Sequence, residues 1–275
     1  MACVMAREGL SRSMVAYSRR GVTRSKALEL GLVDEVYEQP MDAVAGADLV
    51  IIATPIGAYA SLAEAVGPTL SPGTIVTDVG SVKQAAIDAV QPHLASGVHF
   101  VPGHPIAGTE HSGPEAGFAD LFEGRWTILT PVQGSDDKVV ERIAELWRCC
   151  GAYVETMKPE HHDMVLSITS HLPHLIAYTI VGTATSLEEE LRQEVIKFSA
   201  SGFRDFTRIA ASDPVMWRDV FLSNKEATLA ILRRFTEDLA AMQRAIETGD
   251  GKTLEDLFSR TRDIRRGIIV ANQAD

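Results

Sequence analysis

The sequence has few cysteines, no excess of positive charge and no signal-like apolar start. Its 275 residues include only Cys3, Cys149 and Cys150, which fit neither a disulfide framework nor a cysteine-based metal site. The formal net charge of −11 argues against a nucleic acid or an anionic membrane as partner. We expect no apolar run of transmembrane length, and no signal peptide because Met1–Gly9 has no adequate apolar core. The composition therefore predicts a cytoplasmic protein in a reducing compartment.

Predicted strands and helices alternate over the first part of the chain. Short apolar runs predict strands at 14–17, 48–53, 73–78, 98–101, 126–130 and 153–155. Helices are predicted between them at 27–32, 42–47, 58–70, 83–94 and 137–150. Such alternation favours right-handed crossovers and a mainly parallel sheet. The later stretches all read as helical, at 161–185, 187–199, 205–211, 214–249 and 254–269.

We therefore expect two domains, an α/β domain of residues 1–157 and an all-α domain of residues 158–275. The first has the pattern of a Rossmann-like dinucleotide-binding domain, but its first strand and its G-x-G-x-x-G turn are absent. Residues 1–9 instead predict the helix that such a turn would open. Either this start is internal to the true reading frame or the chain is a natural truncation. In both cases the backbone amides that cradle a pyrophosphate would be missing.

Polar residues follow two of the predicted strands, where an α/β sheet binds its ligands. Ser18, Arg19 and Arg20 follow the first strand, at the place where an acidic residue would hold a ribose 2′-hydroxyl. A serine with two arginines instead suits a 2′-phosphate, which favours NADP over NAD. Thr54 and Pro55 end the second strand, where the backbone could contact the cofactor. The alternatives are a solvated basic turn and an ordinary strand end.

His104 lies in the run Val101–Gly113, directly after a predicted strand. Its prolines and glycines make helix or continuing strand improbable, so we expect a polar loop. An imidazole in a cleft there suits a proton acceptor, whereas the alternative is a solvated surface turn. Ser81 follows the strand 73–78 and could cap the next helix. Its other interpretation places the hydroxyl beside His104, between nicotinamide and substrate.

The helical region contains two further pairs of functional residue types. His171 and His174 are three residues apart on a predicted helix, but no pattern such as H-E-x-x-H accompanies them, so we expect no metal. Two satisfied interior histidines are the alternative. Asp205 and Arg208 are also three apart, and an aspartate there can orient the guanidinium toward a carboxylate. A surface ion pair of little consequence is the alternative.

Several motifs, taken together and in this order, resemble the prephenate/arogenate (cyclohexadienyl) dehydrogenase family of tyrosine biosynthesis. They are Asp78–Lys83 (DVGSVK), Gly103–Glu110 (GHPIAGTE), Ser170–His174 (SHLPH), Asp205–Ala210 (DFTRIA) and Trp217–Asp219 (WRD). The likeness covers essentially the whole chain. It implies oxidative decarboxylation of prephenate, arogenate or both, with hydride transfer to NADP or NAD. It also implies a homodimer formed through the helical domain.

The resemblance implies roles for individual residues. His104 would be the catalytic histidine that bonds the ring 4-hydroxyl, with Ser81 in support. Arg208 would bind a substrate carboxylate, paired with Asp205. Three further residues would line the substrate pocket or shape its entrance, namely His174, Glu110 and Trp217.

Two other functions stay open at this point. A β-hydroxyacid dehydrogenase of similar plan would need a lysine base in the helical domain, for which Lys197 and Lys225 are candidates. Neither lysine accounts for the loop around His104. A truncated pseudoenzyme or dimerisation module is the second alternative, because the glycine-rich turn is missing.

Overall fold

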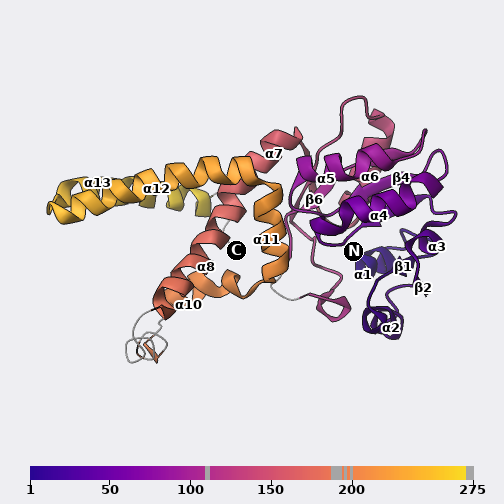
Figure 1. Ribbon diagram of the computed structural model, residues 1–275, viewed down its shortest axis with the longest axis horizontal. Coiled ribbons are helices and arrows are strands. Elements are labelled where there is room, and N and C mark those ends of the chain that lie inside the picture. The colour runs from indigo at the N-terminus through magenta and orange to yellow at the C-terminus, as the bar shows by residue number, and fades with distance from the viewer. Residues whose placement is uncertain (109–111, 187–193, 195–196, 199–200, 271–275) are drawn as a thin grey trace. The chain divides into compact units, whose positions relative to one another are not determined.

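The computed structural model describes residues 1–108, 112–186, 194, 197–198 and 201–270 (Figure 1). The chain divides into two compact units, residues 1–228 and residues 229–275, which are described separately. The division expected between residues 157 and 158 stays a prediction.

The described strands of the first unit form three small sheets. In the first sheet, β1 (Val15–Tyr17) pairs in parallel with β2 (Glu35–Tyr37), a strand that the sequence pattern did not predict. The second sheet is parallel in the order β3 (Leu49–Ile52), β4 (Ile75–Asp78) and β5 (His99–Val101). In the third, β7 (Trp126–Leu129) pairs antiparallel with β6 (Gly103–Pro105) and parallel with β8 (Tyr153–Thr156).

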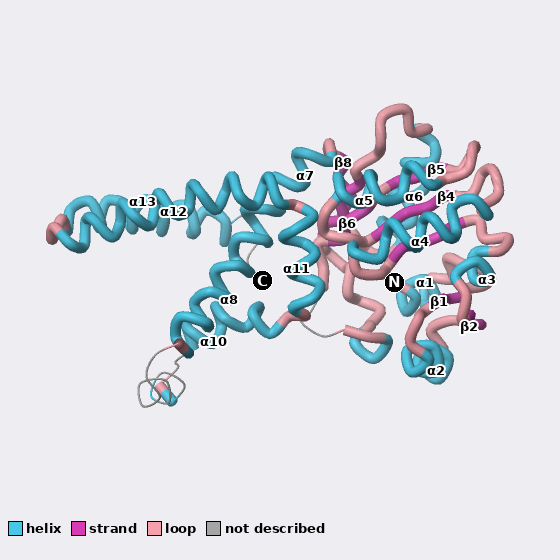
Figure 2. Tube along the Cα trace, viewed as in Figure 1, coloured by secondary structure: helices cyan, strands magenta, loops and turns pink. Residues whose placement is uncertain are grey.

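Helices connect these strands, as the alternation predicts. They are α1 (Ala2–Arg7), α2 (Gly21–Glu29), α3 (Pro40–Val44), α4 (Tyr59–Val66), α5 (Lys83–Val90) and α6 (Asp137–Cys149). Figure 2 shows α4 and α5 lying side by side along the β3–β5 sheet. A 3₁₀ turn, η1 (Ile56–Ala58), leads from β3 into α4.

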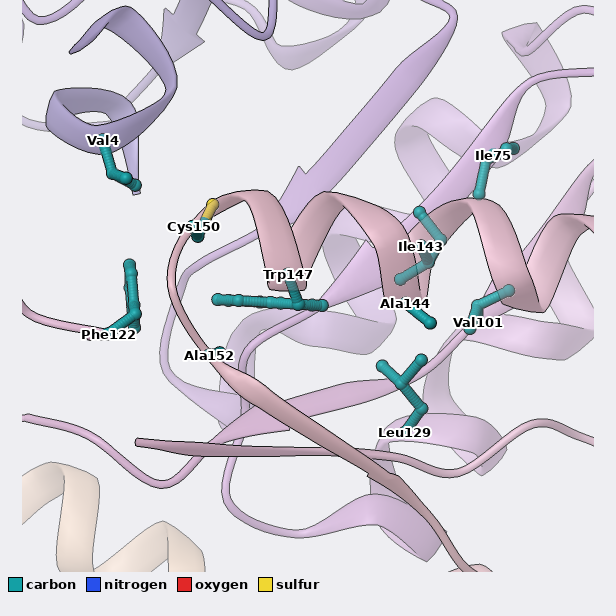
Figure 3. Packing of buried hydrophobic residues seen from close by; sticks show 10 residues of the cluster. All are labelled: Val4, Ile75, Val101, Phe122, Leu129, Ile143, Ala144, Trp147, Cys150 and Ala152. Carbon is teal, nitrogen blue, oxygen red and sulfur yellow. The ribbon is translucent and has the colours of Figure 1, made fainter. Parts of the chain in front are cut away.

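Two apolar clusters hold the helices to the strands. Successive side chains of a strand point to opposite faces, so Val76 and Phe100 join α4 and α5 in one cluster. Their neighbours Ile75 and Val101 join α6 in the other cluster, shown in Figure 3. Trp147 of α6 is fully buried there and contacts Phe122 edge to face. The β3–β5 sheet is therefore covered by helices on both faces, which leaves its carboxyl edge to carry polar groups.

The rest of the first unit is helical. It comprises α7 (Pro159–Leu166), a π-helical turn η5 (Ser167–His171), α8 (Leu172–Thr185), α10 (Ser201–Thr207), a 3₁₀ turn η6 (Arg208–Ala211) and α11 (Pro214–Ser223). α12 (Lys225–Glu247) begins in this unit, and α13 (Gly251–Val270) lies in the second. The single helix expected at 214–249 is instead two, because the chain breaks at Asn224. Most of the helix expected at 187–199 lies outside the described residues.

One helix, Pro159–Thr185, is long and apolar enough to cross a membrane by length and composition alone. It runs from α7 through α8, has a mean hydropathy of 1.4, and 22% of it is buried. The expectation that no stretch reaches this length was therefore wrong. Glu160 and Asp163 carry its only charges apart from its histidines, and both lie in its first turns. One such helix is weak evidence of a membrane span, since helices of soluble proteins also pass this test.

Candidate active site

His104 lies in a strand, not in the loop that the sequence predicts. Only Pro102 separates the end of β5 from the start of β6, and His104 is paired with Ile128 of β7. Pro105 is tolerated because β6 is the edge strand of its sheet and needs bonds on one side only. The ladder continues through the Ile106 amide, which donates to the Trp126 carbonyl at 2.7 Å. The strand fixes the backbone that carries the imidazole.

His104 is buried and contacts a second imidazole from the helical region. Its Nδ1 lies 2.9 Å from Nε2 of His162, which is itself fully buried at the start of α7. The other ring nitrogen of His162, Nδ1, lies 2.8 Å from Oδ1 of Asp163. These contacts form a continuous line from the carboxylate of Asp163 through His162 to His104. The sequence analysis did not identify His162 or Asp163.

Asp163 also binds the amino end of α5. Its Oδ1 accepts the backbone N–H of Lys83 at 2.8 Å, and its Oδ2 accepts that of Gln84 at 3.0 Å. This corrects one of the two interpretations of Ser81, because Val82 is the N-cap residue and its side chain makes no capping bond. Ser81 remains at the carboxyl end of β4, in the turn before α5. Its placement beside His104 stays a prediction.

A buried ion pair lies beside Gly103, the residue that precedes His104. Lys83 is fully buried, and its Nζ donates to Asp78 Oδ2 at 2.5 Å and to the Gly103 carbonyl at 2.6 Å. Asp78 also accepts the hydroxyl of Tyr59 at 3.0 Å and the amide of Gly103 at 3.1 Å. Burial lowers the pKa of Lys83, and the charge of Asp78 opposes that shift. The pair ties α5 to the residue that precedes His104.

This environment keeps His104 neutral. Burial holds its pKa well below 6.5, and repulsion from His162, Lys83 and His171 adds to the effect. Burial also lowers the pKa of His162, although Asp163 opposes that shift. At neutral pH both rings are therefore uncharged, and a neutral imidazole is the form that can accept a proton.

The predicted substrate-binding residues of the helical region come together near these rings. His171 is fully buried and lies edge to face with Trp217, with ring centres 6.0 Å apart. Trp217 stacks on His174 with ring centres 3.6 Å apart. The positive charge of Arg208 contributes to lowering the pKa of His174, after the larger effect of burial. The rings of His171, Trp217 and His174 therefore form one cluster, in which His171 acts electrostatically on His104 and Arg208 on His174.

The π-helical turn η5 separates His171 from His174, and the two side chains have different hydrogen-bond partners. His171 ends the turn, and its Nδ1 lies 3.1 Å from the side-chain nitrogen of Asn224. His174 follows in α8, where its Nδ1 donates to the Ser170 carbonyl at 2.8 Å. Within the part of the chain that the structure describes, no cluster of histidine, cysteine and acidic side chains could hold a metal ion.

One prediction about the substrate site, the Asp205–Arg208 pair, differs from the structure, and another concerns a residue that the structure does not describe. In the described residues no hydrogen bond or ion pair joins Asp205 to Arg208, although Arg208 does have an interaction partner. The helix α10 ends at Thr207 and a 3₁₀ turn starts at Arg208, so the two residues do not share one α-helical face. Glu110 lies outside the described residues.

The predicted cofactor residues lie at the carboxyl ends of their strands. Ser18, Arg19 and Arg20 directly follow β1, and both arginines are exposed. Their turn is held by Arg24, which donates to the Ser18 carbonyl at 2.7 Å and pairs with Glu38. These exposed cations leave donors for an anionic part of a dinucleotide.

Thr54 and Pro55 follow β3 at the corresponding place. Thr54 has a buried hydroxyl oxygen with no hydrogen-bond partner among the described residues. Both strand ends lie where an α/β sheet binds its ligands. The contacts of these residues with a cofactor stay a prediction.

Comparison with known proteins agrees with this geometry. Residues 1–156 match the family model of the prephenate dehydrogenase nucleotide-binding domain, and residues 158–260 match that of the prephenate dehydrogenase dimerization domain. The chain belongs to the prephenate dehydrogenase family. The predicted fold class, a Rossmann-like domain followed by a helical region, is thereby confirmed. Membership also decides against a β-hydroxyacid dehydrogenase, for which Lys197 and Lys225 were candidate bases.

Individual members of the prephenate dehydrogenase family resemble the chain over most of its length. The cyclohexadienyl dehydrogenase of Zymomonas mobilis is 40% identical over 249 residues, which are 90% of this chain and 85% of that protein. The prephenate dehydrogenase of Aquifex aeolicus, crystallised with hydroxyphenyl propionate and NAD+, is 35% identical with a TM-score of 0.90, over 97% of this chain and 93% of that one. The arogenate dehydrogenase of Synechocystis is 26% identical with a TM-score of 0.79, over 97% and 86%.

Proposed function

We propose that the protein catalyses the oxidative decarboxylation of prephenate, arogenate or both, with NAD or NADP as hydride acceptor. The products are 4-hydroxyphenylpyruvate from prephenate and tyrosine from arogenate. The observation that carries the proposal is the buried, neutral imidazole of His104, held through His162 by Asp163. Family membership and the names of the relatives support the substrate class.

His104 acts as the base in this reaction. Its imidazole accepts the proton of the 4-hydroxyl, and bound NAD or NADP would supply the acceptor for the hydride that leaves the ring carbon carrying this hydroxyl. Carbon dioxide leaves from the opposite ring carbon, and formation of the aromatic ring makes the step irreversible. A base with a pKa below neutrality is in its active form over the physiological range.

Arg208, with His174, binds a carboxylate of the substrate. A guanidinium offers two parallel N–H donors to a carboxylate, which fixes the ring as well as its charge. Trp217, stacked on His174, supplies an apolar wall. We assign Ser81 a supporting contact to the hydroxyl, and Asp205 and Glu110 to the surroundings of the substrate. Local cations are needed because the net charge of −11 opposes an anionic substrate.

The cofactor is held at the carboxyl ends of β1 and β3. Ser18, Arg19 and Arg20 would bind the ribose side and slightly favour NADP, because they offer cations and a hydroxyl where NAD needs an acidic partner. Thr54 and Pro55 would contact the nucleotide after β3. Because a relative was crystallised with NAD+, both NAD and NADP are to be tested as cofactors.

The protein would act in the cytoplasm as a homodimer formed through its helical region, residues 158–275. Support comes from the family model of a dimerization domain and from the long apolar helix Pro159–Thr185, most of which is not buried within the chain. A second copy would cover that apolar surface and explain why it is compatible with water.

The test is turnover of each substrate with each cofactor, together with the variant His104→Asn. We expect kcat to fall about 100-fold to 10,000-fold, as for loss of a general base, while binding of a product analogue changes little. His161→Asn is the matched control, because that neighbouring histidine is exposed. Equal kcat for His104→Asn and the unaltered protein would refute the role of His104. Failure to bind either cofactor in a titration would favour the pseudoenzyme alternative.

A further inference from the structure

We infer that Asp163 and His162 are positioning residues that fix the tautomer of His104, so that its Nε2 carries the lone pair. The inference deepens the proposed function, in which His104 is the base, and rests on it. It adds two residues of α7 that act on the reaction through another side chain. The tautomer can be measured without turnover, so the two proposals can fail separately.

Asp163 offers the oxygens of its carboxylate as hydrogen-bond acceptors. It accepts two backbone N–H groups at the amino end of α5, from Lys83 and Gln84. Both carboxylate oxygens are thus engaged as acceptors, at an end of a helix that favours negative charge. The contact of 2.8 Å with His162 then requires that Nδ1 of His162 carries the proton.

The proton on Nδ1 determines the rest of the line. His162 is fully buried, and it lies near the cation of Lys83 as well as the anion of Asp78. Kept neutral by burial, it has a bare Nε2, which can only accept. The 2.9 Å contact then requires that Nδ1 of His104 donates. A neutral His104 with its proton on Nδ1 has a bare Nε2, which is the atom able to accept a proton.

The alternative arrangement is unproductive. If His162 carried two protons, its Nε2–H would donate to Nδ1 of His104, and His104 would hold its own proton on Nε2. That tautomer cannot accept the substrate proton. The groups around the pair are Lys83, Asp78, Asp163 and His171, and burial with the nearby cation opposes a second proton on His162. In other enzymes a carboxylate orients a catalytic histidine directly. Here a second imidazole, that of His162, lies between the carboxylate and the histidine.

The experiment is the variant Asp163→Asn. Asparagine caps helices about as well as aspartate, and with its oxygen at the place of Oδ2 it keeps accepting the amide of Gln84. Its NH₂ group then stands at the place of Oδ1, where the Lys83 amide loses its acceptor and Nδ1 of His162 receives a donor, which reverses both hydrogen bonds of the line. We expect kcat to fall by roughly 100-fold or more, as when the wrong tautomer is imposed elsewhere, with little change in the affinity for a product analogue.

Nitrogen-15 NMR of histidine-labelled protein reads the tautomer directly. In the unaltered protein Nε2 of His104 should show the shift of a bare nitrogen, and in Asp163→Asn the shift of a protonated one. A protonated Nε2 in the unaltered protein at neutral pH would overturn the inference, whether or not the enzyme turns over substrate. This measurement also decides the matter if Asp163→Asn does not fold.

Two variants of His162 separate positioning from packing. His162→Gln places an amide oxygen that can accept from Nδ1 of His104, whereas His162→Leu fills the space without an acceptor. We expect the glutamine variant to keep at least about 10-fold more kcat than the leucine variant, with equal affinity for the product analogue. His161→Asn again serves as the control. Equal kcat for the glutamine and leucine variants would contradict the inference.

Discussion

Replacing Lys83 with methionine should destabilise the protein by about 3 kcal/mol, because it leaves the carboxylate of Asp78 buried without its cation. Both side chains are fully buried, and their atoms Nζ and Oδ2 are 2.5 Å apart. Methionine is similar in length and apolar, so the change removes charge with little change in volume. The perturbation therefore tests the ion pair and not the packing.

The magnitude follows from the donors that remain. Removing one partner of a buried pair typically costs about 3–5 kcal/mol. Asp78 keeps the hydroxyl of Tyr59 and the amides of Gly80 and Gly103 as donors, at 3.0, 2.9 and 3.1 Å. Three neutral hydrogen bonds offset part of the lost attraction, so we expect a value near the lower end of that range. The Gly103 carbonyl also loses a donor, which keeps the cost above that of an exposed pair.

The assay is the free energy of unfolding from urea titrations at neutral pH. The double variant Lys83→Met with Asp78→Asn should recover part of the loss, because no charge is then left buried. Lys252→Met is the matched control, since that lysine pairs with Asp256 on the surface and should change stability by less than about 1 kcal/mol. A cost for Lys83→Met no larger than the control's would refute the reasoning.

Two further predictions concern pH and the substrate carboxylate. The pKa of His171 is lowered by burial from 6.5 to about 4, so its contribution to stability is complete above about pH 6.5 and is lost as the pH falls toward 4. Between pH 7 and pH 5, His171→Asn should therefore lose about 2 kcal/mol less stability than the unaltered protein, measured by urea titration at both pH values. An equal acid loss in the variant would contradict the assignment. Arg208→Ala should raise KM by roughly 10-fold to 100-fold in steady-state kinetics, and Arg208→Lys should recover only part because it lacks the planar fork. An unchanged KM would move the carboxylate site elsewhere.

The layered part of the fold could be predicted because its signals are local. The apolar runs at β3 and β4 and the helical stripe of Ile143, Ala144 and Trp147 in α6 are each readable within one element. β2 was missed because its three residues, Glu35–Tyr37, begin with a charged side chain and form no apolar run like that at 14–17. The break at Asn224 was missed for a different reason. Its side chain donates to the backbone carbonyl of Asp163, 61 residues away, and no local pattern encodes that bond.

The candidate site also has residues that the sequence could predict and residues that it could not. The sequence could point to His104 because its neighbours carry a recognisable motif, but its prolines and glycines suggested a loop. The strand forms because β7, more than 20 residues later, supplies the partner. His162 and Asp163 carry no signal of their own, since a His-Asp pair at the start of a helix is usually a solvated or capping group. Their role depends on contacts with residues 58 and 80 positions earlier.

The first turn of α5 connects these separate parts. The side chain of Lys83 binds Asp78 and the carbonyl next to His104, while the backbone of the same residue binds Asp163. One residue thus links the end of β4, the strand that carries His104 and the helix that carries His162 and Asp163. A change at this turn should alter the alignment of His104 and His162 even where the rest of the fold is kept. If His104 is the base, as proposed, variants in the motif Asp78–Lys83 should therefore lower kcat more than equally destabilising variants in α6, because only the former act on the geometry of His104.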